Sequence, residues 1–195
     1  MGLLNQDTIT APVATGFYEY LLVAQPDPEA YAKLMAEKQF FFEKFQTPVA
    51  IKTKPHITVA GFLAFEAMEE TMIRWMARVI SAKQRFSVTL DGYGAFRPHT
   101  LYLHVKDHEP FLQLAKELKV VDQYIQGYGC PEMQLVSNPH LTIARRLDAV
   151  TYAHAVETYA DKTFETSFHV KELVLLRRRG RFDTCRQVNV FGLRP

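Results

Sequence analysis

Residues 55–60 read Pro-His-Ile-Thr-Val-Ala, and residues 139–144 read Pro-His-Leu-Thr-Ile-Ala. Both segments follow the pattern Pro-His-aliphatic-Thr-aliphatic-Ala. In both, polar and aliphatic residues alternate, as they do in a half-buried strand. Successive side chains of a strand point to opposite faces, so His56 shares a face with Thr58. In the second copy, His140 shares a face with Thr142 for the same reason. Each copy is expected to turn its aliphatic residues to the core and its histidine and threonine away from it. A repeat within one chain predicts two related halves that face each other across a cleft.

The composition is that of one folded domain. The chain has 195 residues, of which 48% are hydrophobic, enough for a sizeable core and too many for a disordered chain. The formal net charge of +2 argues against a polycation that coats nucleic acid. Cys130 and Cys185 have neither zinc-type spacing nor a disulfide framework, which favours reduced thiols. Residues 1–15 lack the pattern of a signal peptide, and no apolar stretch approaches membrane-spanning length. We therefore predict a cytoplasmic protein with a single domain over residues 1–195.

Hydrophobic periodicity predicts a chain in which strands and helices alternate, with hairpins between some strands. Strands are expected over residues 16–24, 55–62, 86–90, 101–105, 139–144, 170–176 and 187–191. Helices are expected to start at Asp27, which Pro28 and an acidic first turn follow, and at Phe65, Asp107 and Asp148. Residues 126–137 are expected to form a loop. This mixed order indicates an α+β fold rather than a doubly wound sheet.

Two of these helices carry stripes that we assign to core packing. Met68, Met72 and Met76 recur on one face of the second helix. A methionine-rich stripe can be a binding surface, but burial in the core is the simpler interpretation. In the last helix, Tyr152 and Val156 are expected to face inward.

Two histidines on opposite sides of a phosphorus atom suit an in-line displacement. A neutral imidazole deprotonates water or a ribose hydroxyl, while an imidazolium protonates the departing oxygen, so the two pKa values must differ. The sequence leaves open which of His56 and His140 takes which role. Thr58 and Thr142 can each donate a hydroxyl hydrogen to a non-bridging phosphate oxygen. We predict these four as catalytic residues, with no metal or other cofactor because the general acid neutralises the leaving oxygen.

Basic residues near the motifs are predicted to bind an anionic substrate. Lys54 precedes the first histidine, Arg145 follows the second motif, and Arg179 belongs to a basic turn over residues 177–182. Strict alternation would place Arg146, rather than Arg145, on the face of the histidine, although strands often end or bend at such a position. For each of these residues a solvated surface charge is the alternative.

Other side chains have competing interpretations. Tyr102 is predicted to bind substrate by stacking on a base, together with His104 on the same strand face, and simple solvent exposure of that face is the alternative. His99 also follows a proline, but Thr100 is adjacent to it and faces away, so we interpret His99 as a turn residue. His99, His104 and Cys130 lack the spacing of a known metal site, so no metal site is predicted.

The duplicated motif resembles those of the two-histidine (2H) phosphoesterase superfamily, which includes RNA 2′,3′-cyclic phosphodiesterases and 2′-5′ RNA ligases. The first copy, continuing through residues 61–63, is similar to the family's first motif, and the second copy has the family's trailing arginine at Arg145. Residues 172–177, the basic turn and a final strand resemble the family's C-terminal end. The resemblance extends from about Phe17 to Leu193. It implies a bilobed α+β fold with pseudo-twofold symmetry and a central cleft between two mostly antiparallel sheets.

The resemblance also implies a chemistry. His56 and His140 would be the acid/base pair, Thr58 and Thr142 would hold the phosphate, and no metal would take part. The expected activity is hydrolysis of a 2′,3′-cyclic phosphate to a 2′-phosphomonoester, and two alternatives stay open: a non-catalytic RNA- or nucleotide-binding module and a 2′-5′ RNA ligase. The expected partners are an RNA end, a cyclic nucleotide or an ADP-ribose-type substrate, with no membrane, and the protein is expected to be a monomer.

Overall fold

The structure of this chain is a computed structural model, which describes residues 16–180 and 183–195. The expectation for residues 1–15, and Arg181 and Phe182 of the basic turn, lie outside these residues. The strands are β1 (Phe17–Ala24), β2 (Ile57–Phe65), β3 (Phe86–Phe96), β4 (Thr100–Val105), β5 (Gln134–Leu135), β6 (His140–Ala144), β7 (Glu165–Val170), β8 (Glu172–Arg178) and β9 (Arg186–Gly192). The helices are α1 (Pro28–Phe45), α2 (Val49–Lys52), α3 (Glu69–Ile80), α4 (Glu109–Gln126) and α5 (Ala149–Tyr159), with a 3₁₀ turn η1 (Glu66–Met68).

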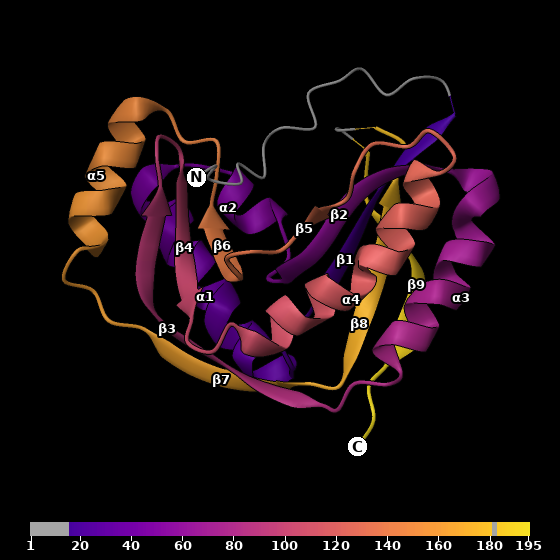
Figure 1. Cartoon of the computed structure of the whole chain (residues 1–195). Helices are drawn as coiled ribbons and strands as arrows, with labels where there is room; N and C mark the ends of the chain where they lie inside the picture. Colours follow the sequence, from indigo (N-terminus) through magenta and orange to yellow (C-terminus); the bar gives the residue numbers. More distant parts are fainter. Residues whose placement is uncertain (1–15, 181–182) are drawn as a thin grey trace.

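Within the described residues the strands form one nine-stranded sheet in the order β7-β3-β4-β6-β2-β1-β8-β9, with β5 paired to β2 beside this path. Neighbouring strands along this order are antiparallel, and the α+β architecture is the predicted one (Figure 1). β2 and β6 meet through the pair of Ile57 with Leu141. We call β2, β1, β8 and β9 the first lobe, and β6, β4, β3 and β7 the second lobe. The two sheets that were predicted are therefore joined into one at the two motif strands.

Helix starts follow the capping chemistry that the sequence predicts. The Asp27 carboxylate accepts a hydrogen bond from the backbone N–H of Ala30 at 3.0 Å, and the Asp148 carboxylate accepts one from that of Thr151 at 2.9 Å. α1 ends at Gln46, which takes the left-handed conformation with a φ of 52°. These caps set the ends of the two helices that flank the second lobe.

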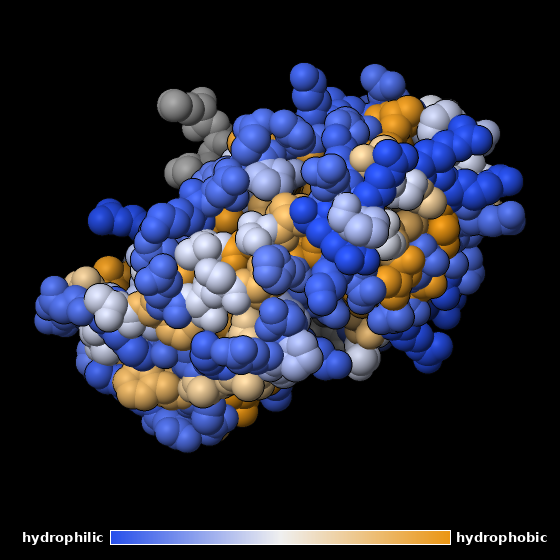
Figure 2. Space-filling view, turned by 90° about the horizontal axis from the view of Figure 1, so that it is seen from below, coloured by the Kyte–Doolittle hydropathy of each residue, from blue (hydrophilic) through white to orange (hydrophobic). Residues whose placement is uncertain are grey.

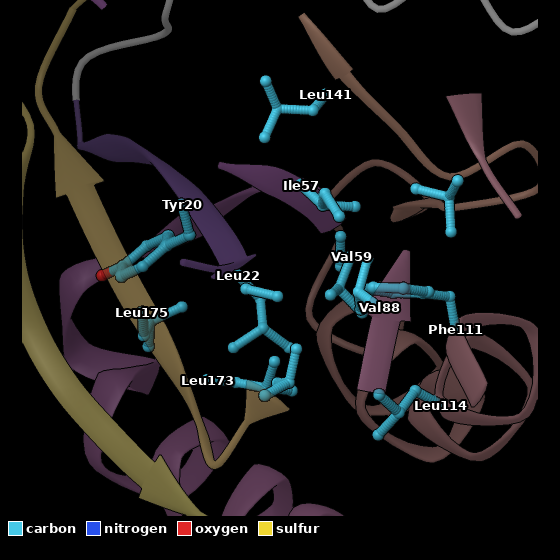
Figure 3. Packing of buried hydrophobic residues seen from close by; sticks show 14 of the residues in the cluster. Tyr20, Leu22, Ile57, Val59, Val88, Phe111, Leu114, Leu141, Leu173 and Leu175 are labelled. Atoms are coloured by element: carbon cyan, nitrogen blue, oxygen red, sulfur yellow. The ribbon is translucent and has the colours of Figure 1, made fainter. Parts of the chain in front are cut away.

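The helices connect the two lobes. α1 leaves β1 of the first lobe but packs against β6 and β7 of the second. α4 leaves β4 of the second lobe but packs against β2 of the first, beside α3, and Figure 1 shows these two helices over that half of the sheet. Figure 3 shows the resulting core around β2, where Ile57 and Val59 lie among side chains such as Leu22 of β1 and Phe111 of α4. Each lobe is thus completed by a helix of the other half.

Both motif strands contain a β-bulge, and it falls at the same place in each copy. In β2 the extra residue is Val59, and in β6 it is Ile143; each is the second aliphatic residue of its motif. A bulge leaves one residue out of the ladder and turns the side chains that follow. The repeat in the sequence is therefore also a repeat in the backbone. The pairs that flank the bulges are Leu22 with Ala60, Val23 with Thr58, Leu101 with Ala144, and Tyr102 with Thr142.

Several elements differ from the prediction. β7 was not predicted; its inward residues Thr166, Phe168 and Val170 alternate with exposed ones, and the expected strand began only at its last residue. The short α2 and β5 were also not predicted, since elements of four and two residues have no periodicity to read. The inward position expected for Val156 is wrong, because its side chain is exposed, whereas the methionine stripe of the second helix is buried as predicted.

Exposed hydrophobic side chains are scattered over the described surface. They are spread over α1, α4, α5, β9 and the loop after α4, and the large ones are Phe40, Leu112, Tyr128, Val150, Val156 and Val190. Figure 2 shows one face of the molecule, on which hydrophilic residues predominate and hydrophobic ones form small areas between them. No helix in the described part of the chain has the length and apolar character needed to cross a membrane.

Candidate functional site

The two motif histidines come together where the lobes join. Because Ile57 pairs with Leu141, continuing this register by one residue on each side places each histidine opposite the threonine of the other motif. His56 and His140 are then diagonal neighbours on one face, an arrangement in which Cα atoms lie roughly 7–8 Å apart. The positive charge of His140 lowers the pKa of His56, in keeping with this proximity. Ile57 and Leu141 point the other way and are fully buried.

The two histidine rings are held in the same way. His56 Nδ1 lies 2.8 Å from the carbonyl oxygen of Lys54, and His140 Nδ1 lies 2.8 Å from that of Asn138. A carbonyl oxygen only accepts, so in the neutral ring Nδ1 carries the hydrogen and Nε2 carries the lone pair. In both copies the partner is the carbonyl two residues before the histidine. Among residues 16–180 and 183–195 neither Nε2 has a hydrogen-bond partner, so each ring can take up or give a proton there.

An aromatic group surrounds His140. Its ring centroid lies 4.8 Å from that of Phe96 and 5.1 Å from that of Tyr102, and the Phe96 and Tyr102 rings stack on each other at 4.2 Å. His104 pairs with His140 across β4 and β6 and lies edge-on to Tyr102. His140 is only 6% exposed, and this burial lowers its pKa, with a further lowering from His104.

Gly94 of β3 makes room for this aromatic group. A Cβ atom at Gly94 would lie 2.5 Å from Cζ of Tyr102 and 2.7 Å from Nε2 of His104. Real Cβ atoms do not approach other atoms so closely, so the two rings occupy space that only a glycine leaves open. Neither Gly94 nor Phe96 was a predicted site residue. The strand was predicted only over residues 86–90, whereas β3 continues to Phe96, so the glycine inside it could not be recognised as one.

His56 lies in a different electrostatic environment. It is partly exposed, yet the surrounding atoms desolvate it enough to lower its pKa from 6.5 to about 4. The nearby charges of Lys38, Arg145 and His140 lower it further, while the hydrogen bond to Lys54 opposes them. The two histidines thus share one geometry but differ in the charges around them.

Lys38 is a site-adjacent residue that the sequence analysis missed. It lies on the inner face of α1, is 1% exposed, and donates from Nζ to the carbonyl oxygens of Thr142 and Ile143 and to the hydroxyl of Thr53. Its burial lowers its pKa to about 7, and the charge of Arg145 adds to this effect. The signal for it was its spacing: Lys38 falls four residues after Leu34 on the apolar stripe of the helix.

The predicted substrate-binding residues lie at different positions relative to the two histidines. Arg145 is half-buried, and its charge acts on both His56 and Lys38, whereas Arg146 is exposed with a φ of 57°. The bulge at Ile143 shifts the alternation by one residue, which explains why Arg145, and not Arg146, approaches the site.

Tyr102, Lys54 and Arg179 fit the prediction less well. Tyr102 lies at the site but is only 6% exposed, and one face of its ring is covered by Phe96. Lys54 contacts His56 through its carbonyl oxygen, and its side chain is exposed. Arg179 is exposed just beyond the end of β8. Both side chains are exposed, so substrate binding by Lys54 and Arg179 stays a prediction, beside the alternative of a solvated surface charge.

Part of the basic turn is neutralised by acidic neighbours. Arg177 lies 2.8 Å from carboxylate oxygens of both Glu66 and Glu69, and Arg178 forms a two-pronged pair with Glu19. The turn is therefore less available to an anion than its sequence indicates. No group of three or more His, Cys, Asp or Glu residues within 16–180 and 183–195 lies together as a metal site requires.

Comparison with known proteins places this geometry in context. The profile of the 2′-5′ RNA ligase superfamily matches residues 26–181. The structure is similar to that of E. coli LigT complexed with 3′-AMP, with a TM-score of 0.64 and 18% identity, over 91% of this chain and 98% of that one. It is also similar to TT0787 of Thermus thermophilus, with a TM-score of 0.65 and 19% identity, over 89% and 97% of the two chains. A search of curated proteins finds no significant match. The structural likeness, at these identities, concerns the fold.

Proposed function

Since this chain belongs to the 2′-5′ RNA ligase superfamily of two-histidine phosphoesterases, we propose that it hydrolyses 2′,3′-cyclic phosphates to 2′-phosphomonoesters. The observation that carries the proposal is that His56 and His140 are oriented by the same hydrogen bond. In each ring Nδ1 contacts the carbonyl oxygen two residues earlier, which leaves the lone pair on Nε2. An in-line displacement at phosphorus needs one base and one acid on opposite sides, and two such rings supply both.

We propose the roles of the two rings from the charges around them. Lys38 and Arg145 disfavour a proton on His56, so His56 acts as the general base. The pKa of His140 is lowered by burial and by the charge of His104 rather than by these two cations, and a bound phosphate anion favours the protonated ring, so His140 acts as the general acid. His56 takes a proton from water as the water oxygen bonds to phosphorus. The bond from phosphorus to the ribose O3′ breaks, and His140 gives its proton to O3′, which leaves a 2′-phosphate and a 3′-hydroxyl.

The neighbouring hydroxyls and cations complete the proposed site. Thr58 and Thr142, each opposite a histidine, donate to the non-bridging phosphate oxygens, where charge develops in the transition state. Arg145 supplies positive charge from the second lobe. The general acid neutralises the leaving oxygen, so the reaction uses no metal or other cofactor, and a chelator is expected to leave the rate unchanged.

The proposed substrate is a nucleotide phosphate. Solved structures of E. coli LigT are complexes with 3′-AMP, NADP+ and ATP, which supports an RNA end, a cyclic nucleotide or an ADP-ribose-type compound here. The aromatic group of Phe96 and Tyr102 lies beside His140, where the half-buried Phe96 ring can contact a base. The free thiols Cys130 and Cys185 fit a protein that works in a reducing cytoplasm, and a monomer is the state we propose.

Two other activities remain open for the same site. The name of the matched superfamily supports 2′-5′ RNA ligation, in which a 5′-hydroxyl would take the place of water: His56 takes the proton of this hydroxyl as its oxygen bonds to phosphorus, and His140 gives its proton to O3′ as the bond from phosphorus to O3′ breaks. A binding module would hold the nucleotide without converting it.

The deciding experiment incubates the protein with 2′,3′-cyclic AMP, CMP, GMP and UMP and with RNA ending in a 2′,3′-cyclic phosphate, with and without a chelator. The product is identified by chromatography. We expect 2′-phosphomonoesters only. Joined RNA strands on a gel would favour ligation instead, and saturable binding without product would favour the binding module.

A further inference from the structure

We propose that Lys38 is a positioning residue of this site, whose buried ammonium fixes the bulge of β6 and supplies positive charge that attracts a bound phosphate group without contacting it. This inference rests on the proposed function for its chemistry, but its test does not depend on turnover. Lys38 comes from α1, which leaves the first lobe, and it reaches the motif strand of the second.

The contacts of Nζ account for all three of its hydrogens. It lies 3.0 Å from the carbonyl oxygen of Thr142, 2.9 Å from that of Ile143, and 3.3 Å from Oγ1 of Thr53. The Thr53 hydroxyl donates to the carbonyl oxygen of Val49 at 3.1 Å, so toward Lys38 it accepts. Three acceptors around one nitrogen suit the protonated amine, since a neutral amine has only two hydrogens to donate.

The position of these contacts is what makes Lys38 relevant to the chemistry. Ile143 is the bulge residue of β6, so its carbonyl oxygen is not held by a regular ladder. Thr142 is the motif threonine, and Arg145 follows two residues after the bulge. By holding this point, Lys38 fixes the orientation of the threonine hydroxyl and of the arginine together.

The first motif provides an internal comparison. Its bulge residue, Val59, has its carbonyl oxygen bonded by the backbone N–H of Val136 at 2.9 Å. An uncharged donor thus suffices to hold a bulge of this kind. At the second bulge the donor is a lysine that is 1% exposed, and burying a charge costs several kcal/mol unless it is paired. A backbone N–H would support the bulge equally well, so the energetic cost of burying the Lys38 charge is not explained by support of the bulge alone.

The charge has no acidic partner within the described part of the chain. The neighbouring Glu37 pairs with Lys162 instead, and the group that acts on Lys38 is another cation, Arg145. A buried ammonium without an acidic partner, whose charge acts on His56, favours the binding of an anion beside this histidine. A phosphate group between the rings would supply the missing negative charge.

The charged and titratable groups around His56 determine how the removal of Lys38 changes the pKa of His56. They are Lys38 from α1, Arg145 after β6 and His140 from β6, while His104 of β4 acts on His140 and Cys185 lies near Arg145. All those that act on His56 are cationic when protonated. Removing one of them therefore raises the pKa of His56 and weakens the attraction for an anion.

The test compares K38M, which keeps the side-chain length without the charge, with K33M as the matched control on the exposed side of the same helix, where Lys33 pairs with Glu29. Histidine ring protons are titrated by NMR, and inorganic phosphate is added as the probe. In K38M we expect the His56 pKa to rise by roughly half a unit or more, and phosphate affinity to fall on the order of tenfold. A folded K38M that matches K33M in both measurements would overturn the inference.

A second measurement needs no variant, in case K38M does not fold. The Cε carbon of Lys38 in the wild-type protein is titrated with and without saturating inorganic phosphate. Phosphate is expected to raise the pKa of Lys38, because the anion favours the ammonium. An unchanged pKa at saturation, or no phosphate binding at all, contradicts the inference. Phosphate coupling to Lys38 without turnover of any cyclic phosphate would instead contradict the proposed hydrolase and leave Lys38 as an anion-site residue.

Discussion

Ile57 and Leu141 pair across the junction of the two lobes, and this pair fixes the register of the two motif strands. His56 immediately precedes Ile57, and His140 immediately precedes Leu141. Both histidines therefore lie on the face of the sheet opposite to these two aliphatic side chains. A slip of either strand by one residue would turn the histidine of that strand to the opposite face, away from the histidine of the other strand. The position of the candidate site is thus a consequence of where two fully buried aliphatic residues meet.

Removing either threonine hydroxyl is expected to slow the reaction without unfolding the protein. Thr58→Val and Thr142→Val keep the side-chain shape but lose the donor to the phosphate, so kcat/KM should fall by roughly 10- to 100-fold. Thr58→Ser and Thr142→Ser are the matched controls and should stay close to wild type. Initial rates with 2′,3′-cyclic AMP provide the measurement, and valine variants with wild-type rates would exclude the hydroxyls from the chemistry.

The pH dependence of kcat/KM should be bell-shaped with its optimum on the acidic side of pH 6.5. In the free protein both histidine pKa values are lowered, that of His56 to about 4. The rate should fall below about pH 4 as the base becomes protonated, and fall again at higher pH as His140 loses its proton. The profile of kcat should lie at higher pH because the bound anion stabilises the protonated ring. A kcat/KM optimum above pH 7 would contradict the assigned environments.

Stability should decrease as the pH falls from about 6.5 to about 4. In this window the unfolded chain binds a proton at residue 56 and the folded chain does not, so the free energy of unfolding rises with pH. The expected contribution of His56 is about 2 kcal/mol, allowing for its partial exposure. Urea unfolding of the wild type and of H56Q at pH 7.5, 5.5 and 4.5 measures this contribution as the difference between the free energies of unfolding of the two proteins. Parallel pH curves for the two proteins would rule out a lowered pKa at this residue.

Gly94→Ala should disturb the aromatic group beside His140. The added methyl would lie 2.5 Å from Cζ of Tyr102, so the stacked Tyr102 and Phe96 rings must move. We expect kcat/KM to fall about tenfold and the protein to lose about 1–3 kcal/mol of stability. Gly192→Ala is the control, because nothing lies within 4 Å of its Cβ position. Equal behaviour of the two variants would show that the close packing at Gly94 has no bearing on the site.

The motif histidines and threonines could be predicted because strand alternation alone decides which side chains share a face. Alternation failed at Arg145, since a bulge at Ile143 shifts the pattern by one residue. Bulges arise from how two strands meet, and a single strand's sequence does not reveal them. The core strands and the helices capped by Asp27 and Asp148 were predicted for the same local reasons.

Residues that reach the site from distant elements could not be predicted. Lys38 lies about a hundred positions before the strand it contacts, and its meaning depends on α1 crossing to the second lobe. Phe96 and Gly94 depend likewise on how β3 packs beside β4. The basic turn shows the opposite case, in which charges that stand out in the sequence are paired with acids from other elements.

The central claim is that His56 and His140 act as one acid/base pair on a cyclic phosphate. It is tested most directly by following the conversion of 2′,3′-cyclic AMP to 2′-AMP with the wild type, H56A, H140A and the double variant. Each single variant should lose at least about 10³-fold in kcat while keeping a wild-type fold by circular dichroism, and the double variant should lose little more, since the two groups act in one step. Wild-type turnover by either single variant would contradict the account.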